Sequence, residues 1–131
     1  MSQAVVLDAS VLIAAMSAAD AHHESARSIL RRGAICSALH AHPMTIAETA
    51  VGAARLNRVD PLRHALRALG VATVEIDDEQ PWRLAHLRAR TGLPLPDCCV
   101  LDTATSLGGR LATFDQRLRS AAERVGVTVV E

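Results

Sequence analysis

The sequence predicts an α/β fold in which a parallel sheet of about five strands carries helices on both faces. Short apolar segments rich in Val and Leu alternate along the chain with longer segments that have helix start and stop signals, and half of the 131 residues are apolar. Such alternation is typical of parallel sheets, and this length suits one core. We therefore expect residues 1–131 to form a single domain.

Five segments are expected to form strands because they are short, apolar and rich in β-branched residues. They are residues 4–7, a short strand near 38–42, and residues 71–77, 110–114 and 127–130. Helices are placed by their capping signals. Asp20 is expected to cap a helix that ends at Arg32, before Gly33, and Asp60 is expected to cap a helix that stops at Gly70. The remaining helices are expected after residue 8, from residue 43, and over residues 78–92, 97–109 and 115–125.

Composition excludes several classes of function. All 14 basic residues are Arg, so the chain has no P-loop, which needs a Lys on the nucleotide phosphates, and is no receiver domain. Arg binds phosphate well, so nucleic acid is not excluded as a partner, although 2% aromatic residues leave little scope for stacking on bases. Three cysteines without C-x-x-C spacing favour neither a disulfide framework nor a zinc ribbon. We expect them to be reduced, in the core or at an interface.

The N-terminal segment does not resemble a targeting signal. The first basic residue is Arg27, and the apolar run over residues 11–16 is too short to span a bilayer. We expect a cytoplasmic protein with no membrane association.

Four carboxylates are expected at the carboxyl edge of the sheet, where ligands bind in folds of this class. Asp8 ends the first strand, Asp115 ends the strand at 110–114, Asp97 opens the helix after "GLPLP", and Glu48 lies in the first turn of the helix begun by "PMTIAE". At a separation of about 4 Å and an effective dielectric of about 20, each pair would repel by roughly 4 kcal/mol, so the cluster needs cations. Oxygen ligands of this kind suit Mg²⁺ or Mn²⁺.

Three of these acids also have a purely structural explanation. Asp97 and Asp115 stand where helix caps are found, and Thr45 with Glu48 fits a capping box. Asp8 has no equally good explanation, because Ser10 is better placed to cap the helix that follows.

Two further groups of residues are assessed for metal binding. Asp102 lies in the helix of Asp97 but about 140° around its axis, so we expect it to face solvent or a partner subunit, and Asp102→Ala to change stability by less than about 0.5 kcal/mol. The H-x-H of His40 and His42 allows zinc as an alternative, but no Cys lies at ligand spacing from the histidines.

The segments that carry the four acids resemble a known family. "VVLDASVLIA", "TIAE", "LPLPDCCVLDTA" and "LATFDQRL" are similar in order and spacing to the acidic motifs of PIN-domain ribonucleases, in particular the small VapC-type toxins of bacterial toxin-antitoxin pairs. The resemblance covers the whole chain. It implies a Mg²⁺- or Mn²⁺-dependent endoribonuclease whose catalytic and metal-binding residues are Asp8, Glu48, Asp97 and Asp115, with Ser10 and Thr113 as supporting hydroxyls.

The resemblance also implies partners: RNA as substrate, an antitoxin protein that occludes the cleft, and a second copy of the chain in a homodimer. "DAHHESA" is similar to a toxin feature in which a His near the start of the second helix fixes the loop after the first. With the four site acids set aside, 14 Arg face 10 acids, so phosphate contacts are expected from Arg. The candidates are Arg31, Arg32, Arg55, Arg58, Arg88 and Arg90.

Two other functions are compatible with parts of the sequence. A phosphatase with Asp8 as nucleophile would need D-x-D, whereas the third residue is Ser10 and Lys is absent. A PIN-like domain that binds its partner without catalysis is the stronger alternative, because a fold does not establish an activity.

Overall fold

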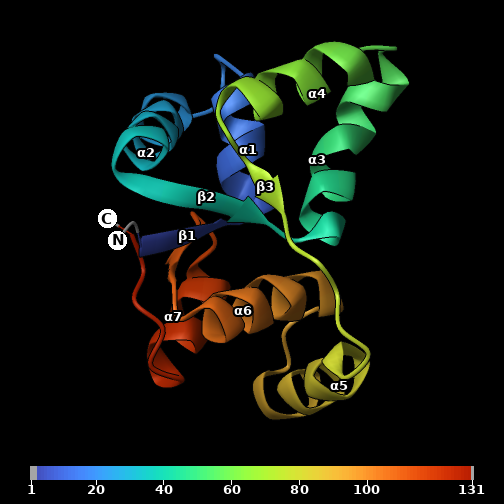
Figure 1. The fold of residues 1–131 in the computed structure, drawn as a ribbon, viewed down its shortest axis with the longest axis vertical. Coiled ribbons are helices and arrows are strands. Elements are labelled where there is room, and N and C mark those ends of the chain that lie inside the picture. Colours follow the sequence, from blue (N-terminus) through green and yellow to red (C-terminus); the bar gives the residue numbers. More distant parts are fainter. Residues whose placement is uncertain (1–2, 131) are drawn as a thin grey trace.

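The computed structural model describes residues 3–130 and shows a parallel sheet between two layers of helices (Figure 1). The four strands of the sheet are β1 (Gln3–Leu7), β2 (Ser37–Ala41), β3 (Ala72–Thr73) and β4 (Arg110–Ala112). They stand in the order β3-β2-β1-β4, and every neighbouring pair is parallel. The predicted α/β class and parallel sheet are therefore confirmed, with one strand fewer than expected.

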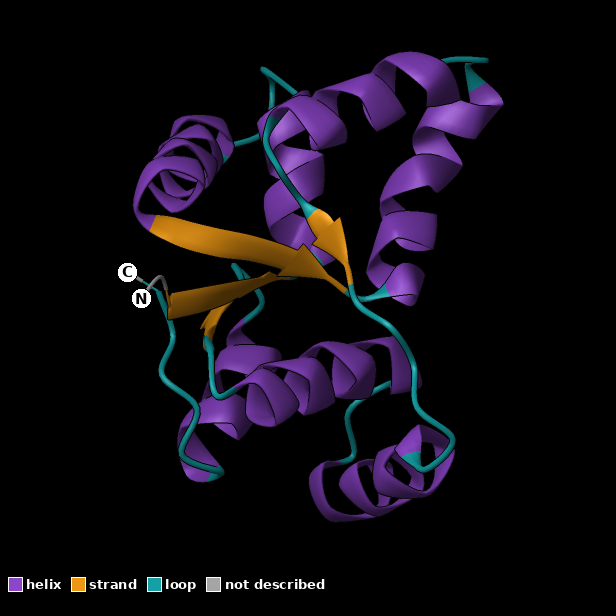
Figure 2. Ribbon diagram, in the orientation of Figure 1, coloured by secondary structure: helices purple, strands orange, loops and turns teal. Residues whose placement is uncertain are grey.

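Seven helices lie within the described residues. They are α1 (Ala9–Met16), α2 (His23–Cys36), α3 (Pro43–Arg55), α4 (Val59–Ala68), α5 (Gln80–Thr91), α6 (Leu95–Leu107) and α7 (Gln116–Arg124). Figures 1 and 2 show α1 to α4 on one side of the sheet and α5 to α7 on the other. None of these helices is both long and apolar enough to cross a membrane.

The central strand β1 supplies side chains to both cores. Val6 packs into a cluster with residues of α6 and α7, whereas Val5 and Leu7 pack with residues of α1 and α2. Alternate residues of a strand point to opposite faces of its sheet. A strand covered on both faces reads as a continuous apolar run, which explains why "AVVL" shows no alternation.

Three predicted strands are shorter than expected, and one of them is β4, which ends at Ala112 instead of residue 114. β3 is limited to Ala72–Thr73 instead of residues 71–77, and the charged residues that follow it leave the sheet toward α5 (Figure 1). Residues 127–130 form only an isolated bridge between Leu111 and Val129, although the amide of Val130 still donates to the carbonyl of Leu111 at 2.8 Å. Both segments lie at edges of the sheet, where pairing on one side only limits strand length.

The predicted boundaries of α2 are wrong. The Asp20 carboxylate accepts the amide of His22 at 2.8 Å in the preceding turn, and the helix begins at His23. Gly33 does not stop it, because the helix continues to Cys36. A Cβ atom at Gly33 would lie 2.5 Å from Cδ2 of Leu39, so this glycine permits close packing of α2 on β2.

The other helices depart less from the prediction. α4 begins at Val59, before the expected cap Asp60, and Gly70 follows the helix with a positive φ of 76°. α6 begins at Leu95 rather than residue 97 and ends at Leu107, and Gly108 after it adopts the left-handed conformation. Cys98 and Cys99 of α6 are buried free thiols, as expected, and Cys36 is an exposed one.

Candidate functional site

Asp8 lies at the carboxyl end of β1, with only 6% of its surface exposed. Its Oδ2 accepts hydrogen bonds from the hydroxyls of Ser10 at 2.7 Å and Thr113 at 2.8 Å. Ser10 Oγ in turn accepts the amide of Phe114, and Thr113 Oγ1 accepts the amide of Asp115, both at 3.0 Å. These bonds fix the orientation of the Asp8 carboxylate and connect β1 to the loop after β4.

The expected role of Ser10 as a helix cap is wrong. Ser10 is the second residue of α1, and its hydroxyl orients Asp8 instead. Asp8 itself occupies the cap position, with extended backbone angles, but its side chain makes no capping hydrogen bond. The Asp8 carboxylate is thus buried at the edge of the sheet and does not cap α1.

Asp115 does have the structural role that the sequence allowed. Its Oδ1 accepts the amides of Arg117 at 2.9 Å and Leu118 at 3.1 Å, which caps the exposed first turn of α7. The cap fixes the carboxylate of Asp115 next to the loop that holds Asp8.

Glu48 belongs to no capping box. The cap of α3 is His42, whose Nδ1 accepts the amide of Met44 at 2.9 Å. Thr45 is fully buried, and its hydroxyl has no hydrogen-bond partner among the described residues. Glu48 is the sixth residue of α3, beyond the first turn where it was expected, and its side chain is exposed.

Asp97 is also not a cap. It lies in the first turn of α6, two residues after the helix begins, and the cap position is occupied by Pro94. The structural explanations offered for Glu48 and Asp97 therefore both fail, and only Asp115 keeps one.

The four carboxylates influence one another electrostatically. Burial and then the charges of Asp8, Asp115 and Glu48 raise the pKa of Asp97 to about 6, and Arg117 opposes this shift. Burial and then the charge of Asp8 raise the pKa of Glu48. Asp97 thus lies within electrostatic reach of the other three acids.

The arrangement is not a finished coordination shell. Within residues 3–130, no three His, Cys, Asp or Glu side chains are close enough to hold a metal ion together. The set of donors nevertheless fits a hard divalent cation: it consists of oxygen atoms only, and their mutual repulsion is the kind that a cation relieves.

Zinc binding by His40 and His42 does not fit the structure. Both ring nitrogens of the buried His42 are occupied, Nδ1 by the amide of Met44 and Nε2 by Oε1 of Gln80 at 2.9 Å. His23 has the expected structural role, because its Nδ1 lies 2.9 Å from the carbonyl of Ala14 and ties α2 to α1.

The prediction for Asp102 is wrong. Asp102 is only 5% exposed, and its carboxylate accepts hydrogen bonds from Nε and Nη2 of Arg83 at 2.9 and 3.1 Å and from Nε2 of Gln80 at 3.1 Å. The reasoning failed because α6 is buried on all sides from Cys98 to Ala104. A helix enclosed in this way has no single apolar stripe. The available signal was that Asp102 is the one charged residue in "CCVLDTATSL", residues 98–107. Gln80 and Arg83 were missed altogether.

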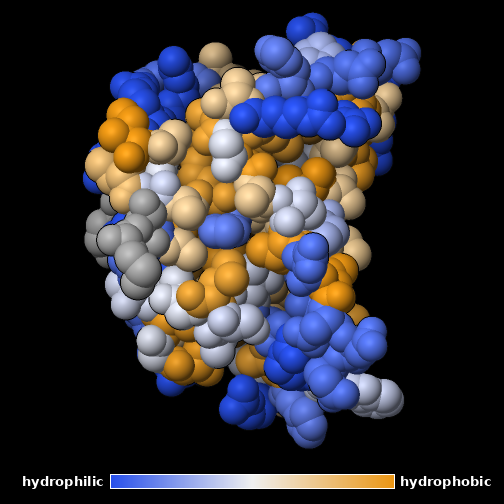
Figure 3. All heavy atoms as spheres, in the orientation of Figure 1, coloured by the Kyte–Doolittle hydropathy of each residue, from blue (hydrophilic) through white to orange (hydrophobic). Residues whose placement is uncertain are grey.

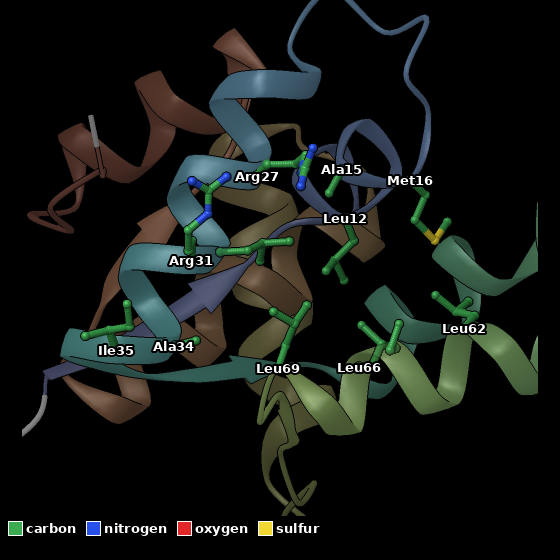
Figure 4. A pocket seen from close by; sticks show the side chains of 12 residues that line it. Leu12, Ala15, Met16, Arg27, Arg31, Ala34, Ile35, Leu62, Leu66 and Leu69 are labelled. Atoms are coloured by element: carbon green, nitrogen blue, oxygen red, sulfur yellow. The ribbon is translucent and has the colours of Figure 1, made fainter.

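Of three surface hollows, one is lined by Glu48 and another by Gln116 and Arg117, the residues that follow Asp115. One of about 650 Å³ lies between α7 and the chain that follows the end of α5, and is lined partly by Arg117 and Arg124. A second, of about 630 Å³, is lined by Glu48 together with apolar residues of α1, α3 and α4. The third, of about 370 Å³, lies between α1, α2 and α4, where Leu12 faces Leu66 and Leu69 (Figure 4).

Apolar side chains reach the surface over the middle of the molecule. On the face seen in Figure 3, hydrophilic side chains gather over the outer helices, and apolar ones lie between them. Exposed apolar residues include Ile13 and Met16 of α1, Ile35 of α2 and Leu56 at the end of α3. All four line the second or the third hollow.

Several solved structures of known proteins have a similar fold. A toxin-antitoxin complex from Klebsiella pneumoniae contains a chain with a TM-score of 0.76 and 22% identity, with 96% of each chain covered. The sarcin-ricin-loop-cleaving toxin VapC20 from Mycobacterium tuberculosis gives a TM-score of 0.75 at 16% identity, over 97% of this chain and 98% of that one. VapBC2 from Rickettsia felis, bound to a promoter DNA fragment, gives 0.70 at 13% identity, over 98% and 97%.

At these identities the solved structures show the fold alone, and a search of curated proteins finds no match. The family comparison is more direct, because the profile described as "PIN domain" matches residues 5–124. That span contains all four candidate acids and both supporting hydroxyls. The chain belongs to the PIN domain family.

Proposed function

We propose that this protein is a metal-dependent endoribonuclease toxin of the VapC type that acts in the cytoplasm and is neutralised by a cognate antitoxin. The observation that supports this most is the PIN-domain match over residues 5–124, which includes the buried Asp8 at the carboxyl end of β1. The charges of Asp8, Asp115 and Glu48, which together with burial raise the pKa of Asp97, agree with it. Acids that raise the pKa of one of their number, with only partial compensation by Arg117, favour a cation as the missing partner.

Asp8, Glu48, Asp97 and Asp115 would hold the Mg²⁺ or Mn²⁺. When bound, such an ion supplies a water of lowered pKa and neutralises charge on the reacting phosphate. Ser10 and Thr113 both donate to Oδ2 of Asp8, so they would orient the carboxylate that holds the metal. The hydroxyls are supporting residues, because they orient a ligand rather than bind the substrate.

Arg117 is the residue best placed to contact RNA phosphates. It lies close enough to Asp97 to oppose the rise in its pKa, and it shares the exposed hollow beside α7 with Arg124. Arg binds phosphate through planar, bidentate hydrogen bonds. Neither residue was among the arginines expected from the sequence.

The two apolar hollows are the proposed binding surface for the antitoxin. They share Met16, Leu62 and Ala65, so they form one surface that runs from α2 to Glu48. An apolar segment of a partner bound along this surface would end next to the acids and block access to them. The VapBC2 structure supports such a partner by analogy. Homodimer formation stays a prediction of the family resemblance.

The test is RNA cleavage by the purified protein with a single-stranded RNA substrate and Mn²⁺. Cleavage should stop when EDTA is added and in Asp8→Asn, which keeps the shape of the side chain and removes its charge. Asp60→Asn is the matched control, because this exposed residue of α4 lies outside the acid site. Cleavage that persists in EDTA or in Asp8→Asn would refute the proposal.

The alternative is a PIN-like domain that binds its partner without catalysis. It is favoured by the lack, within residues 3–130, of three acids close enough to hold a metal as they stand. Calorimetry with Mn²⁺ separates the two functions: binding that is lost in Asp8→Ala supports the nuclease, whereas no specific binding by the wild type supports the binding module.

A further inference from the structure

A buried chain of hydrogen bonds joins the helices that carry Glu48 and Asp97. It consists of His42 at the start of α3, Gln80 and Arg83 of α5, and Asp102 of α6, and we call it the His42–Asp102 network. Gln80 links its two ends, with Oε1 2.9 Å from Nε2 of His42 and Nε2 3.1 Å from Oδ2 of Asp102. His42, Gln80 and Asp102 are each at most 6% exposed.

The direction of every hydrogen bond in this network is determined. Nδ1 of His42 accepts a backbone amide, that of Met44, so in the neutral ring the hydrogen is on Nε2. Nε2 therefore donates to Oε1 of Gln80, which leaves the Gln80 amide group to donate to Asp102. Asp102 accepts at both carboxylate oxygens, Oδ1 from Arg83 and Oδ2 from Gln80 and Arg83. A network with a single consistent pattern of donors and acceptors holds its members in one arrangement.

Arg83 neutralises the charge of Asp102. Its Nε and Nη2 donate to the two carboxylate oxygens, and its Nη1 and Nη2 also donate to Asp77 at 3.1 and 2.8 Å. Apolar residues of similar size in place of a buried ion pair often leave stability unchanged or improve it. Stability alone therefore does not account for a network of this kind, and its geometric precision suggests a role in positioning.

The network spans the two halves of the acid site. Glu48 follows His42 by six residues in α3, and Asp97 precedes Asp102 by five residues in α6. These helices lie on opposite sides of the sheet (Figure 1), and the network bridges them through α5. Because a helix moves as a rigid unit, a shift between His42 and Asp102 would change the separation of Glu48 and Asp97.

We propose that the His42–Asp102 network is a positioning device that sets the separation of Glu48 and Asp97 and thereby the affinity of the acid site for divalent cations. The inference rests on the proposed function, since it assumes that these acids bind metal. Its members touch neither the acids nor the substrate in the contacts described, so they are positioning residues. Residues that orient metal ligands from outside the first shell typically change metal affinity by about 10- to 100-fold.

The first test is Gln80→Met, which keeps the length of the side chain and removes the hydrogen bonds to both His42 and Asp102. Arg83 still pairs with Asp102 in this variant, so the fold should be retained. We expect the dissociation constant for Mn²⁺, measured by calorimetry on the full chain, to rise about tenfold or more. Thermal unfolding in EDTA measures the loss of stability separately.

The second test restores the charge at another position of the network. Asp102→Asn removes the carboxylate and should weaken Mn²⁺ binding, and the addition of Gln80→Glu returns a carboxylate that accepts from His42 and from the new amide. The double variant should recover most of the lost Mn²⁺ affinity. A merely destabilising substitution would not be rescued in this way.

Ile29→Ala is the matched control. Ile29 is buried in α2, a helix that carries none of the four acids, so the substitution should lower the melting temperature without a change in Mn²⁺ affinity. If wild-type protein binds no Mn²⁺, the proposed function fails and this inference fails with it. If wild-type protein binds Mn²⁺ and Gln80→Met and Asp102→Asn bind it as tightly as Ile29→Ala does, the positioning role alone is refuted.

Discussion

Asp8 and Asp102 are both almost completely buried, at 6% and 5% exposure, but their surroundings are opposite. Asp102 is paired with Arg83 and accepts three hydrogen bonds from two neighbouring side chains. Asp8 is held by two hydroxyls, and the charges it acts on, Glu48 and Asp97, are negative like its own. A buried carboxylate whose charge is compensated stabilises one arrangement of the chain. One whose charge is not compensated is available for a ligand.

The comparison predicts the largest effect on activity at Asp8. Asp8→Asn should lower the rate of RNA cleavage in Mn²⁺ by about 100-fold or more, because a charged metal ligand is lost, while the protein stays folded. A time course of cleavage together with circular dichroism measures both quantities. A folded Asp8→Asn variant that cleaves at the wild-type rate would show that the charge of Asp8 is not needed for cleavage.

The next largest effect is expected at Asp102, on stability. Asp102→Ala should lower the free energy of unfolding by about 3 kcal/mol, because it leaves Gln80 and a partly exposed Arg83 without their partner. Urea unfolding in EDTA provides the measurement, with Asp60→Ala as an exposed control in α4. A loss of less than about 0.5 kcal/mol would indicate that the network is not formed as described.

Glu48 should separate activity from stability. Glu48→Gln is expected to reduce cleavage far more than it reduces the melting temperature, because the exposed carboxylate makes no capping hydrogen bond and borders the hollow beside the acids. Parallel cleavage assays and thermal unfolding curves test this expectation. A large fall in melting temperature with metal-dependent cleavage retained would show that Glu48 stabilises the fold and does not act in the acid site.

The smallest effect concerns pH and the metal-free protein. The pKa of Asp97 is about 6 in the folded state, against an ordinary value of 3.8, so the folded state binds this proton more tightly than the unfolded state does. The contribution of Asp97 to stability should therefore be greatest below about pH 4 and decline as the pH rises through about 6.

Urea midpoints in EDTA at about pH 5 and about pH 7 test this decline, with Asp97→Asn as the comparison. The variant should lack the part of the pH dependence that Asp97 causes. Identical pH dependence in both proteins would mean that the other acids do not act on Asp97.

The places of Asp8 and Asp115 at the ends of strands could be predicted from the sequence, whereas the packing around α6 could not. The position of Asp8 after a buried strand and that of Asp115 after β4 follow from local pattern, because the end of a strand is visible in the order of residues. The angular position of Asp102 around the axis of α6 led to the wrong prediction that it is exposed, because the prediction assumed that one side of α6 faces solvent. Whether α5 covers that side depends on the path of the chain after β3, which no local pattern specifies.

Close side-chain packing could not be predicted from the sequence either. Gly33 reads as a helix stop, yet it lies inside α2 because the methyl groups of Leu39 occupy the space that a side chain would need. Thr45 and Glu48 fit a capping box by spacing, but His42 reaches the amide of Met44 first and also binds Gln80. In both cases a side chain outside the local motif, Leu39 or His42, decided between two local interpretations.

The short edge strand β3 limits how copies of this chain can associate. β3 consists of Ala72 and Thr73, with one further hydrogen bond from the amide of Val74 to the carbonyl of Ala41 in β2. Glu75, Asp77 and Asp78 follow shortly after. Long, flat, unpaired strands invite sheet-to-sheet addition and aggregation, whereas short edges followed by charge resist it. On the far side, the bridge between Leu111 and Val129 covers part of β4. A continuous intermolecular sheet is therefore disfavoured at both ends, and a second copy would have to pack through the helices.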